Sequence, residues 1–175
     1  MLSGEKNIQP SVLLRALEIE DLPYLYQWEN DALAWGDSGT HNPLSQKLLR
    51  EYIENASGDL YVDGQLRLII KCDGQTAGAI DLFDLDPRSR KAAIGMYIAP
   101  ECRGKGVGHA AVRLLEKYAF DFLHLHQLYA IIATDNHPCR AIYTSAGFIP
   151  SATLKDWVIR KDGYTDAIVY QKFEP

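Results

Sequence analysis

The chain has 175 residues, of which 47% are hydrophobic and 23% charged, a balance typical of a globular protein. This length predicts one domain spanning residues 1–175, with residues 1–11 as a loose N-terminal extension. The chain carries 18 Lys and Arg against 23 Asp and Glu, a net charge of −5 at pH 7. It therefore lacks the basic character that a nucleic-acid partner requires.

The cysteine pattern and the hydropathy pattern limit the location of the protein. The three cysteines have neither paired nor metal-ligand spacing, which favours free thiols in a reducing compartment. There is no signal-peptide core and no apolar run that approaches eighteen residues. His124 and His126 lie two apart without a third ligand nearby, so no metal is expected. We expect a soluble cytoplasmic protein with no membrane partner.

The N-terminal third predicts a strand followed by two helices. Residues 12–17 form a short apolar run suited to a strand. Asp21 and Ser45 are both good N-cap residues, and apolar side chains follow each of them at helical spacing. The first of these helices should end near Asn30.

The middle of the chain predicts an antiparallel meander of three strands. Asp73-Gly74 is the strongest short signal for a hairpin turn, and a second turn is expected at Asp86-Pro87. The strands are expected at residues 66–72, 76–85 and 91–98.

The C-terminal part alternates helices with strands. Helices are expected at residues 107–122 and 138–145, with a short apolar strand at 128–133 between them. A closing hairpin turns at Asp162-Gly163, between strands at 157–160 and 167–173. Together the elements predict an α+β fold, with a mixed, mostly antiparallel sheet of about seven strands and helices on both faces.

The segment between the third meander strand and the long helix carries the clearest chemical signal. Glycines permit positive φ and close backbone approach, so successive N–H groups can converge on one point. The helix N-terminus behind them adds free N–H groups and partial positive charge. Arg103 and Lys105 add two full charges, so the segment predicts a diphosphate-binding loop. Its residues are Arg103, Gly104, Lys105, Gly106, Val107 and Gly108.

Other phosphate-binding loops fit this segment less well. A Walker loop requires Ser or Thr after Gly-Lys, but Gly106 follows Gly104-Lys105. The dinucleotide fingerprint places glycines at positions 1, 3 and 6, whereas here they stand at 1, 3 and 5 after a meander. A flexible turn with surface charges remains the plain alternative.

The loop and the residues after it resemble the GNAT family of N-acetyltransferases. The coenzyme loop of that family follows the pattern Arg/Gln-x-x-Gly-x-Gly/Ala, which Arg103, Gly106 and Gly108 fill. The resemblance is closest to the branch of ribosomal-protein N-terminal acetyltransferases and spermidine acetyltransferases. A second family motif is an Asn seven residues before a Tyr, followed by Gly-Phe. It is matched by Asn136, Tyr143, Gly147 and Phe148.

The resemblance implies an acetyl-CoA-dependent N-acetyltransferase in which a primary amine attacks the thioester directly within a ternary complex. The pantothenate arm would bond backbone groups of Met96 and Ile98, which requires this strand to diverge from the strand at 128–133. Asn136 would contact the arm or the leaving sulfur, or else cap a helix. Tyr143 would be the general acid that protonates the thiolate, or else fill the core beside Phe148.

The group that deprotonates the amine is not evident from the resemblance. Many relatives place a Glu on the fourth strand, where this chain has Ala93. Asp81 and Asp84 lie on the preceding strand and point to opposite faces unless a bulge intervenes. Glu29 on the first helix is a further candidate. We favour Asp81 and Glu29 as candidates for the base.

The sequence motifs do not identify the amine acceptor. A polyamine, an aminoglycoside or a protein N-terminus would each supply an amine. The segment at residues 34–43 has a single acidic residue, fewer than spermidine acetyltransferases carry there, which disfavours a polyamine. A homodimer is compatible with the resemblance. The alternative function is a non-catalytic module of the same fold that binds acyl-CoA or another protein.

Overall fold

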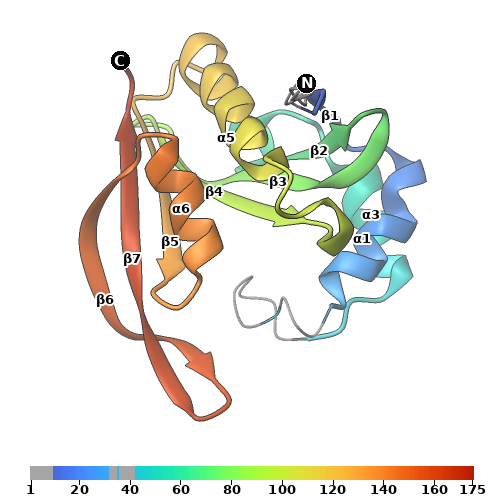
Figure 1. Cartoon of the computed structure of the whole chain (residues 1–175). Coiled ribbons are helices and arrows are strands. Elements are labelled where there is room, and N and C mark those ends of the chain that lie inside the picture. The colour runs from blue at the N-terminus through green and yellow to red at the C-terminus, as the bar shows by residue number, and fades with distance from the viewer. Residues whose placement is uncertain (1–9, 32–34, 36–41) are drawn as a thin grey trace, which may run out of the picture.

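The computed structural model of the protein describes residues 10–31, 35 and 42–175. Seven strands form one sheet in the order β1-β2-β3-β4-β5-β7-β6, and helices pack on both of its faces (Figure 1). Every strand pair is antiparallel except β4 with β5. The predicted α+β class and the predicted sheet are thereby confirmed.

The elements follow the predicted order closely. The strands are β1 (Val12–Ala16), β2 (Leu66–Cys72), β3 (Gln75–Asp86), β4 (Lys91–Ile98), β5 (Gln127–Ala133), β6 (Ile149–Arg160) and β7 (Gly163–Phe173). The helices are α1 (Leu22–Glu29), α3 (Gln46–Asn55), α4 (Leu60–Asp63), α5 (Val107–Lys117) and α6 (His137–Ser145). The last turn of the predicted long helix, Tyr118–Phe122, is a π-helix that continues α5.

Two features of the fold were not predicted. The single-turn helix α4 is capped by the Asp59 carboxylate, which accepts from Tyr61 N, and it ends at Gly64 with φ +68°. The strand β6 begins at Ile149, eight residues before the predicted start at residue 157, and its first half is almost wholly exposed. Such an exposed edge strand lacks the alternation that identifies a strand in sequence.

The two predicted N-caps behave differently. The Ser45 hydroxyl accepts from Leu48 N at 3.2 Å and caps α3, which confirms that prediction. Asp21 occupies the N-cap position of α1, but its side chain makes no capping bond there. Its carboxylate accepts two bonds from Arg15 at 2.6 and 2.7 Å and one from Glu18 N instead. A buried carboxylate is better satisfied by a guanidinium than by one amide.

The expected loose extension lies mostly outside the described residues, which begin at residue 10. Ser11, inside the expected extension, is held by two backbone contacts with the first hairpin turn. Its N–H donates to Asp73 Oδ1 at 3.0 Å, and its carbonyl accepts from Asp73 N at 2.9 Å. None of Cys72, Cys102 and Cys139 forms a disulfide, and no described helix is long and apolar enough to cross a membrane.

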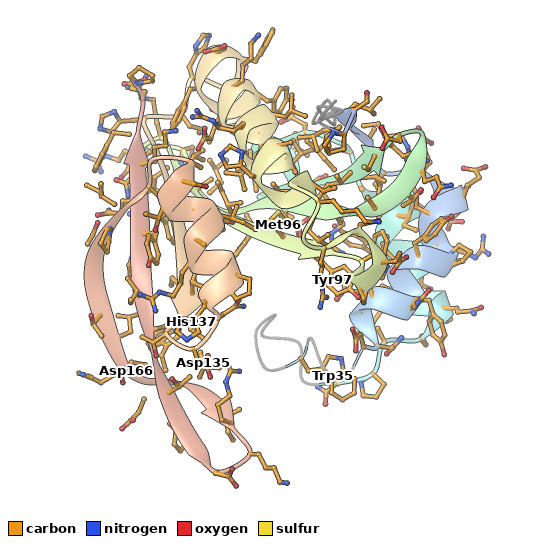
Figure 2. All side chains as sticks on the ribbon, viewed as in Figure 1. Trp35, Met96, Tyr97, Asp135, His137 and Asp166 are labelled. Carbon is orange, nitrogen blue, oxygen red and sulfur yellow. The ribbon has the colours of Figure 1, made fainter. Side chains whose placement is uncertain are left out.

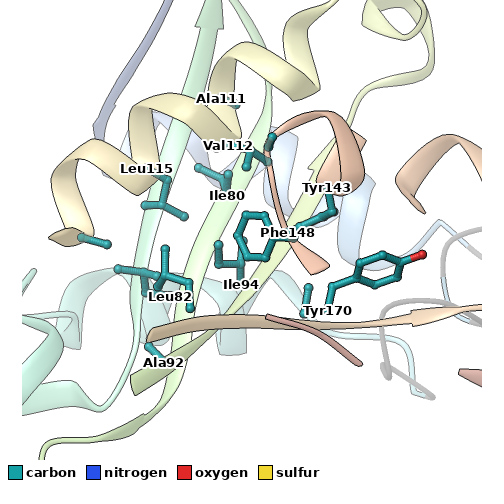
Figure 3. Close-up of a cluster of buried hydrophobic side chains, with 14 of the residues drawn as sticks. Ile80, Leu82, Ala92, Ile94, Ala111, Val112, Leu115, Tyr143, Phe148 and Tyr170 are labelled. Carbon is teal, nitrogen blue, oxygen red and sulfur yellow. The ribbon is translucent and has the colours of Figure 1, made fainter. Parts of the chain in front are cut away.

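The sheet separates two layers of core packing. On one face, Ile80, Leu82 and Ile94 pack beneath α5 and α6 (Figure 3). On the other face, Ile69 and Ala79 pack against α1 and α3. Because strand side chains alternate, Asp81, Ala93 and Tyr129 belong to the face of α1 and α3. Burying each large aliphatic side chain contributes about 1.5–3 kcal/mol, so both layers hold the strands in register.

The strands β4 and β5 run parallel for only three residue pairs and then diverge. The register pairs Lys91 with Gln127, Ala92 with Leu128 and Ala93 with Tyr129, and pairing stops there. Beyond Ala93, β4 continues to Ile98 without a strand partner on that side, which confirms the predicted divergence. Its backbone groups on that side need other partners.

Candidate active site

The predicted diphosphate loop lies between the end of β4 and the start of α5. Gly104 and Gly106 have φ of +71° and +81°, values that L side chains rarely adopt. Gly106 is the N-cap of α5, and the first bond of the helix runs from Ala110 N to Gly106 O. The amides of the three residues between them are therefore the free first-turn donors of the helix. These donors and the helix dipole favour an anion at this end of α5.

Gly108 serves close packing rather than loop conformation. A Cβ at this position would lie 2.9 Å from Ile142 Cδ1 and 3.3 Å from Met96 Cε. The absence of a side chain lets the first turn of α5 approach both β4 and α6. The three alternating glycines thus have two roles: Gly104 and Gly106 determine the loop conformation, and Gly108 allows α5 to pack closely against β4 and α6.

Arg103 folds back over the end of β4. Its Nε donates to Ile98 O at 2.8 Å, and its Cζ lies 5.7 Å from the Tyr97 ring centroid. The carbonyl that the resemblance assigns to the coenzyme arm therefore already accepts a charged hydrogen bond. Lys105 is exposed beside the loop.

Side chains of β4 lie on one side of the β4–β5 divergence, and side chains of the β5–α6 junction lie on the other. Figure 2 shows Met96 and Tyr97 on the β4 side, with Asp135 and His137 at the junction of β5 and α6. Asn136 Oδ1 accepts from Cys139 N at 3.2 Å, so Asn136 caps α6. The helix-cap interpretation is confirmed, and a bond from Asn136 to the coenzyme remains a prediction.

Tyr143 lies in the core face of α6 with only 2% of its surface exposed. Its ring meets Phe148 edge to face at 5.0 Å between centroids (Figure 3). Burial raises the pKa of Tyr143 well above its usual value. The phenol is therefore neutral, and it can donate a hydrogen bond more readily than it can release its proton.

The two candidate bases share one guanidinium. Arg67 on β2 donates from Nε and Nη2 to Asp81 at 2.9 and 2.8 Å, and from Nη1 to Glu29 at 2.6 Å. The three side chains are 15–19% exposed, and the Tyr52 ring lies 5.5 Å from Arg67 Cζ. The carboxylates raise the pKa of Arg67 further above its usual value. Each carboxylate is thus bound to a permanent cation, which argues against Asp81 or Glu29 as a free base.

Arg67 was missed in the sequence, although a signal existed. It interrupts the apolar run Leu66–Cys72, and a cation within a buried strand needs charged partners nearby. The partners could not be named because the ion pairs join three elements: α1, β2 and β3.

Two tryptophans in or near the segment at residues 34–43 have defined contacts. Trp28 of α1 lies 5.5 Å from the Tyr97 ring, and Tyr97 Oη donates to Asp31 Oδ2 at 3.2 Å. Trp35 Nε1 donates to Glu29 O at 2.8 Å. Most of the sparsely acidic segment at residues 34–43 falls outside the described residues. Within the described part of the chain, no group of three His, Cys, Asp or Glu side chains could hold a metal.

The chain is similar in sequence to known acetyltransferases. A family model described as an acetyltransferase (GNAT) domain matches residues 11–149. A spermidine N(1)-acetyltransferase of Escherichia coli is 30% identical over 161 residues, covering 90% of this chain and 83% of that protein. A putative ribosomal N-acetyltransferase of Bacillus subtilis is 34% identical over 130 residues, covering 74% of this chain and 71% of that protein. These are the two kinds of enzyme that the sequence resemblance named.

Solved structures share the fold. The crystal structure of spermidine N-acetyltransferase from Vibrio cholerae, in complex with CoA and spermine, has a TM-score of 0.83 at 23% identity. It covers 93% of this chain, and the match spans 95% of that protein. A crystal structure of a probable acetyltransferase has a TM-score of 0.82 at 29% identity and covers 93% of both chains.

We predict that Arg67→Met destabilises the protein by about 3 kcal/mol, because it leaves two largely buried carboxylates side by side without their counter-ion. Urea unfolding followed by circular dichroism measures the loss. The control is Arg50→Met, which breaks an exposed ion pair with Glu54 on α3 and should cost less than about 1 kcal/mol. Equal losses in both variants would show that the charge cluster has no special role.

Proposed function

We infer the reaction from one premise: the chain belongs to the GNAT acetyltransferase family and is an acetyl-CoA-dependent N-acetyltransferase. We propose that a primary amine attacks the thioester directly while both substrates are bound. The observation that carries this proposal is the divergence of β4 from β5 beside the free amides of α5. At this divergence the coenzyme would lie on one face of the sheet, and the amine would approach from the other.

Two parts of the coenzyme would be bound by different segments of the chain. Its diphosphate would accept from the first-turn amides of α5 and contact Arg103 and Lys105. Its pantothenate arm would lie along β4 like an added strand, bonding backbone groups of Met96 and Ile98. Arg103 would leave Ile98 O as the arm arrives. The proposed coenzyme-binding residues are Met96, Ile98, Arg103, Gly104, Lys105, Gly106, Val107, Gly108 and Asn136.

The chemical step needs an acid at the sulfur. The amine lone pair forms a bond to the carbonyl carbon, and the C–S bond breaks as the tetrahedral intermediate collapses. We propose that the Tyr143 hydroxyl donates a hydrogen bond to the departing thiolate. Because burial raises the pKa of Tyr143, hydrogen bonding contributes more than complete proton transfer.

The acceptor is proposed to be a cationic amine of a small molecule or peptide. The Arg67 cluster has one carboxylate in excess, and its position on the face of α1 and α3 suits an approaching ammonium. The matched relatives are named for spermidine and for ribosomal substrates, so a polyamine and a protein N-terminus are the first candidates. A homodimer remains compatible with this proposal.

We predict that the chain releases free CoA from acetyl-CoA when an amine is present and releases little without one. The measurement is thiol release with a panel of polyamines, aminoglycosides, amino acids and N-terminal peptides. One class should exceed the others in kcat/KM by at least about tenfold, because the walls of the site select the acceptor. A chain that binds acetyl-CoA but acts on no member would support the non-catalytic alternative.

For the loop, we predict that Arg103→Ala weakens acetyl-CoA binding by about 1–3 kcal/mol, since charge-assisted bonds to phosphate are lost. Gly106→Val should weaken it more, because valine resists a φ of +81° and would displace the first-turn amides. Calorimetric titration gives both values. The matched control is Gly58→Val, a change at another positive φ remote from the loop in sequence, which should leave the affinity unchanged.

For the acid, we predict that Tyr143→Phe lowers kcat by one to three orders of magnitude. The ring and its edge contact with Phe148 stay, so acetyl-CoA affinity and the melting temperature should change little. The readouts are steady-state kinetics and calorimetry on the same preparations. Unchanged turnover would leave Tyr143 a packing residue only.

A further inference from the structure

One hydrogen bond on the face of α1 and α3 joins two strands that are not neighbours. Tyr129 of β5 donates from Oη to Asp84 Oδ2 of β3. The strand β4 lies between them in the sheet. Neighbouring strands are about 4.8 Å apart, so β3 and β5 are separated by roughly 10 Å. The Tyr129 side chain must therefore lie across β4 to reach the carboxylate.

The residue beneath this bridge is Ala93. The register pairs Ala93 with Phe83 on one side and with Tyr129 on the other. Ala93 is 4% exposed, although α1 and α3 are packed over Ile69 and Ala79 of the neighbouring strands. A longer side chain at Ala93 would compete with the phenol for the same space. The missing strand carboxylate and the Tyr129 bridge are thus two aspects of one arrangement.

Asp84 reaches this face through a local change of backbone. The pairing of β3 with β4 shifts register between Phe83 and Asp86, and Asp84 has φ +52°. A bulge redirects side chains, and aspartate tolerates the left-handed region better than most residues. The condition stated from the sequence, that Asp81 and Asp84 face apart unless a bulge intervenes, is met by this bulge.

The bridge also lies at the last paired position before β4 and β5 diverge. Under the proposed function, on which this inference rests, the thioester would enter that divergence from its open end. We propose that Tyr129 and Asp84 form a proton relay that takes the proton from the acceptor amine.

The relay balances as follows. The bound ammonium passes one proton to Tyr129 Oη while the Tyr129 proton passes to Asp84, which frees the nitrogen lone pair to bond to the carbonyl carbon. As the C–S bond breaks, the nitrogen loses its second proton, which balances the proton that the thiolate takes up. Asp84 then returns its proton to solvent. Burial and the Asp84 carboxylate raise the pKa of Tyr129 to about 12, so the phenol stays neutral and gives up a proton only as it receives one. Unlike Asp81, Asp84 has no guanidinium among its described partners.

The test compares two amines with Tyr129→Phe and Asp84→Asn. Asparagine also tolerates positive φ, and phenylalanine keeps the ring over Ala93. An alkylamine with a pKa near about 10.4 is almost wholly protonated at pH 7, whereas a peptide α-amine with a pKa near about 7.8 is not. Loss of the relay should lower kcat/KM about 100-fold for the alkylamine and less than about tenfold for the α-amine. The alkylamine rate should then rise tenfold per pH unit from 6 to 9.

The control is Tyr61→Phe, which removes a hydroxyl bonded to Leu123 O at 2.9 Å in a different part of the fold. It should leave the ratio between the amines unchanged. Acetyl-CoA affinity, measured by calorimetry, should match wild type in all variants. Equal losses for both amines, or no loss, would overturn the relay while leaving the proposed function intact. A wild-type chain that acetylates no amine of the panel would overturn the proposed function itself.

Discussion

The separation of β4 from β5 is the constraint on which the rest of the structure depends. Two parallel strands that part leave backbone donors and acceptors that must find partners other than strands. The helices α5 and α6 follow β4 and β5, so their first turns both start near the open end. The glycine loop, the Asn136 cap and the buried Tyr143 therefore belong to the two helices that follow the diverging strands.

The charged side chains on the sheet face that packs against α1 and α3 come from strands and a helix rather than from loops. Arg67 and Asp81 face each other across β2 and β3, and Glu29 is supplied by the helix packed above them. A guanidinium has five donors in a fixed plane, which allows it to bind two carboxylates at once. The Asp84 carboxylate belongs to a separate pair with Tyr129. The face is therefore acidic, and its carboxylates are individually distinguished by their partners.

Local rules account for what the sequence could predict. Turn residues such as Asp73-Gly74, the cap at Ser45 and the glycine spacing all act within a few residues, so they can be recognised without a structure. The Arg67–Glu29 ion pair joins residues that are 38 positions apart and depends on how α1 packs on the sheet. The Tyr129–Asp84 bridge joins residues that are 45 positions apart and depends on strand register and on the bulge in β3. Asp21 failed as a cap because a tertiary partner, Arg15, satisfies its carboxylate better than the helix would.

The bond from Arg103 to Ile98 O has a consequence for affinity. If a ligand bonds this carbonyl in place of Arg103, binding exchanges one hydrogen bond for another instead of adding one. The net gain is then smaller than a count of contacts in the complex would suggest. Under the proposed function, the released guanidinium would become available for a new anionic partner. Arg103 would then couple occupancy of the strand edge to recruitment of charge at the helix terminus.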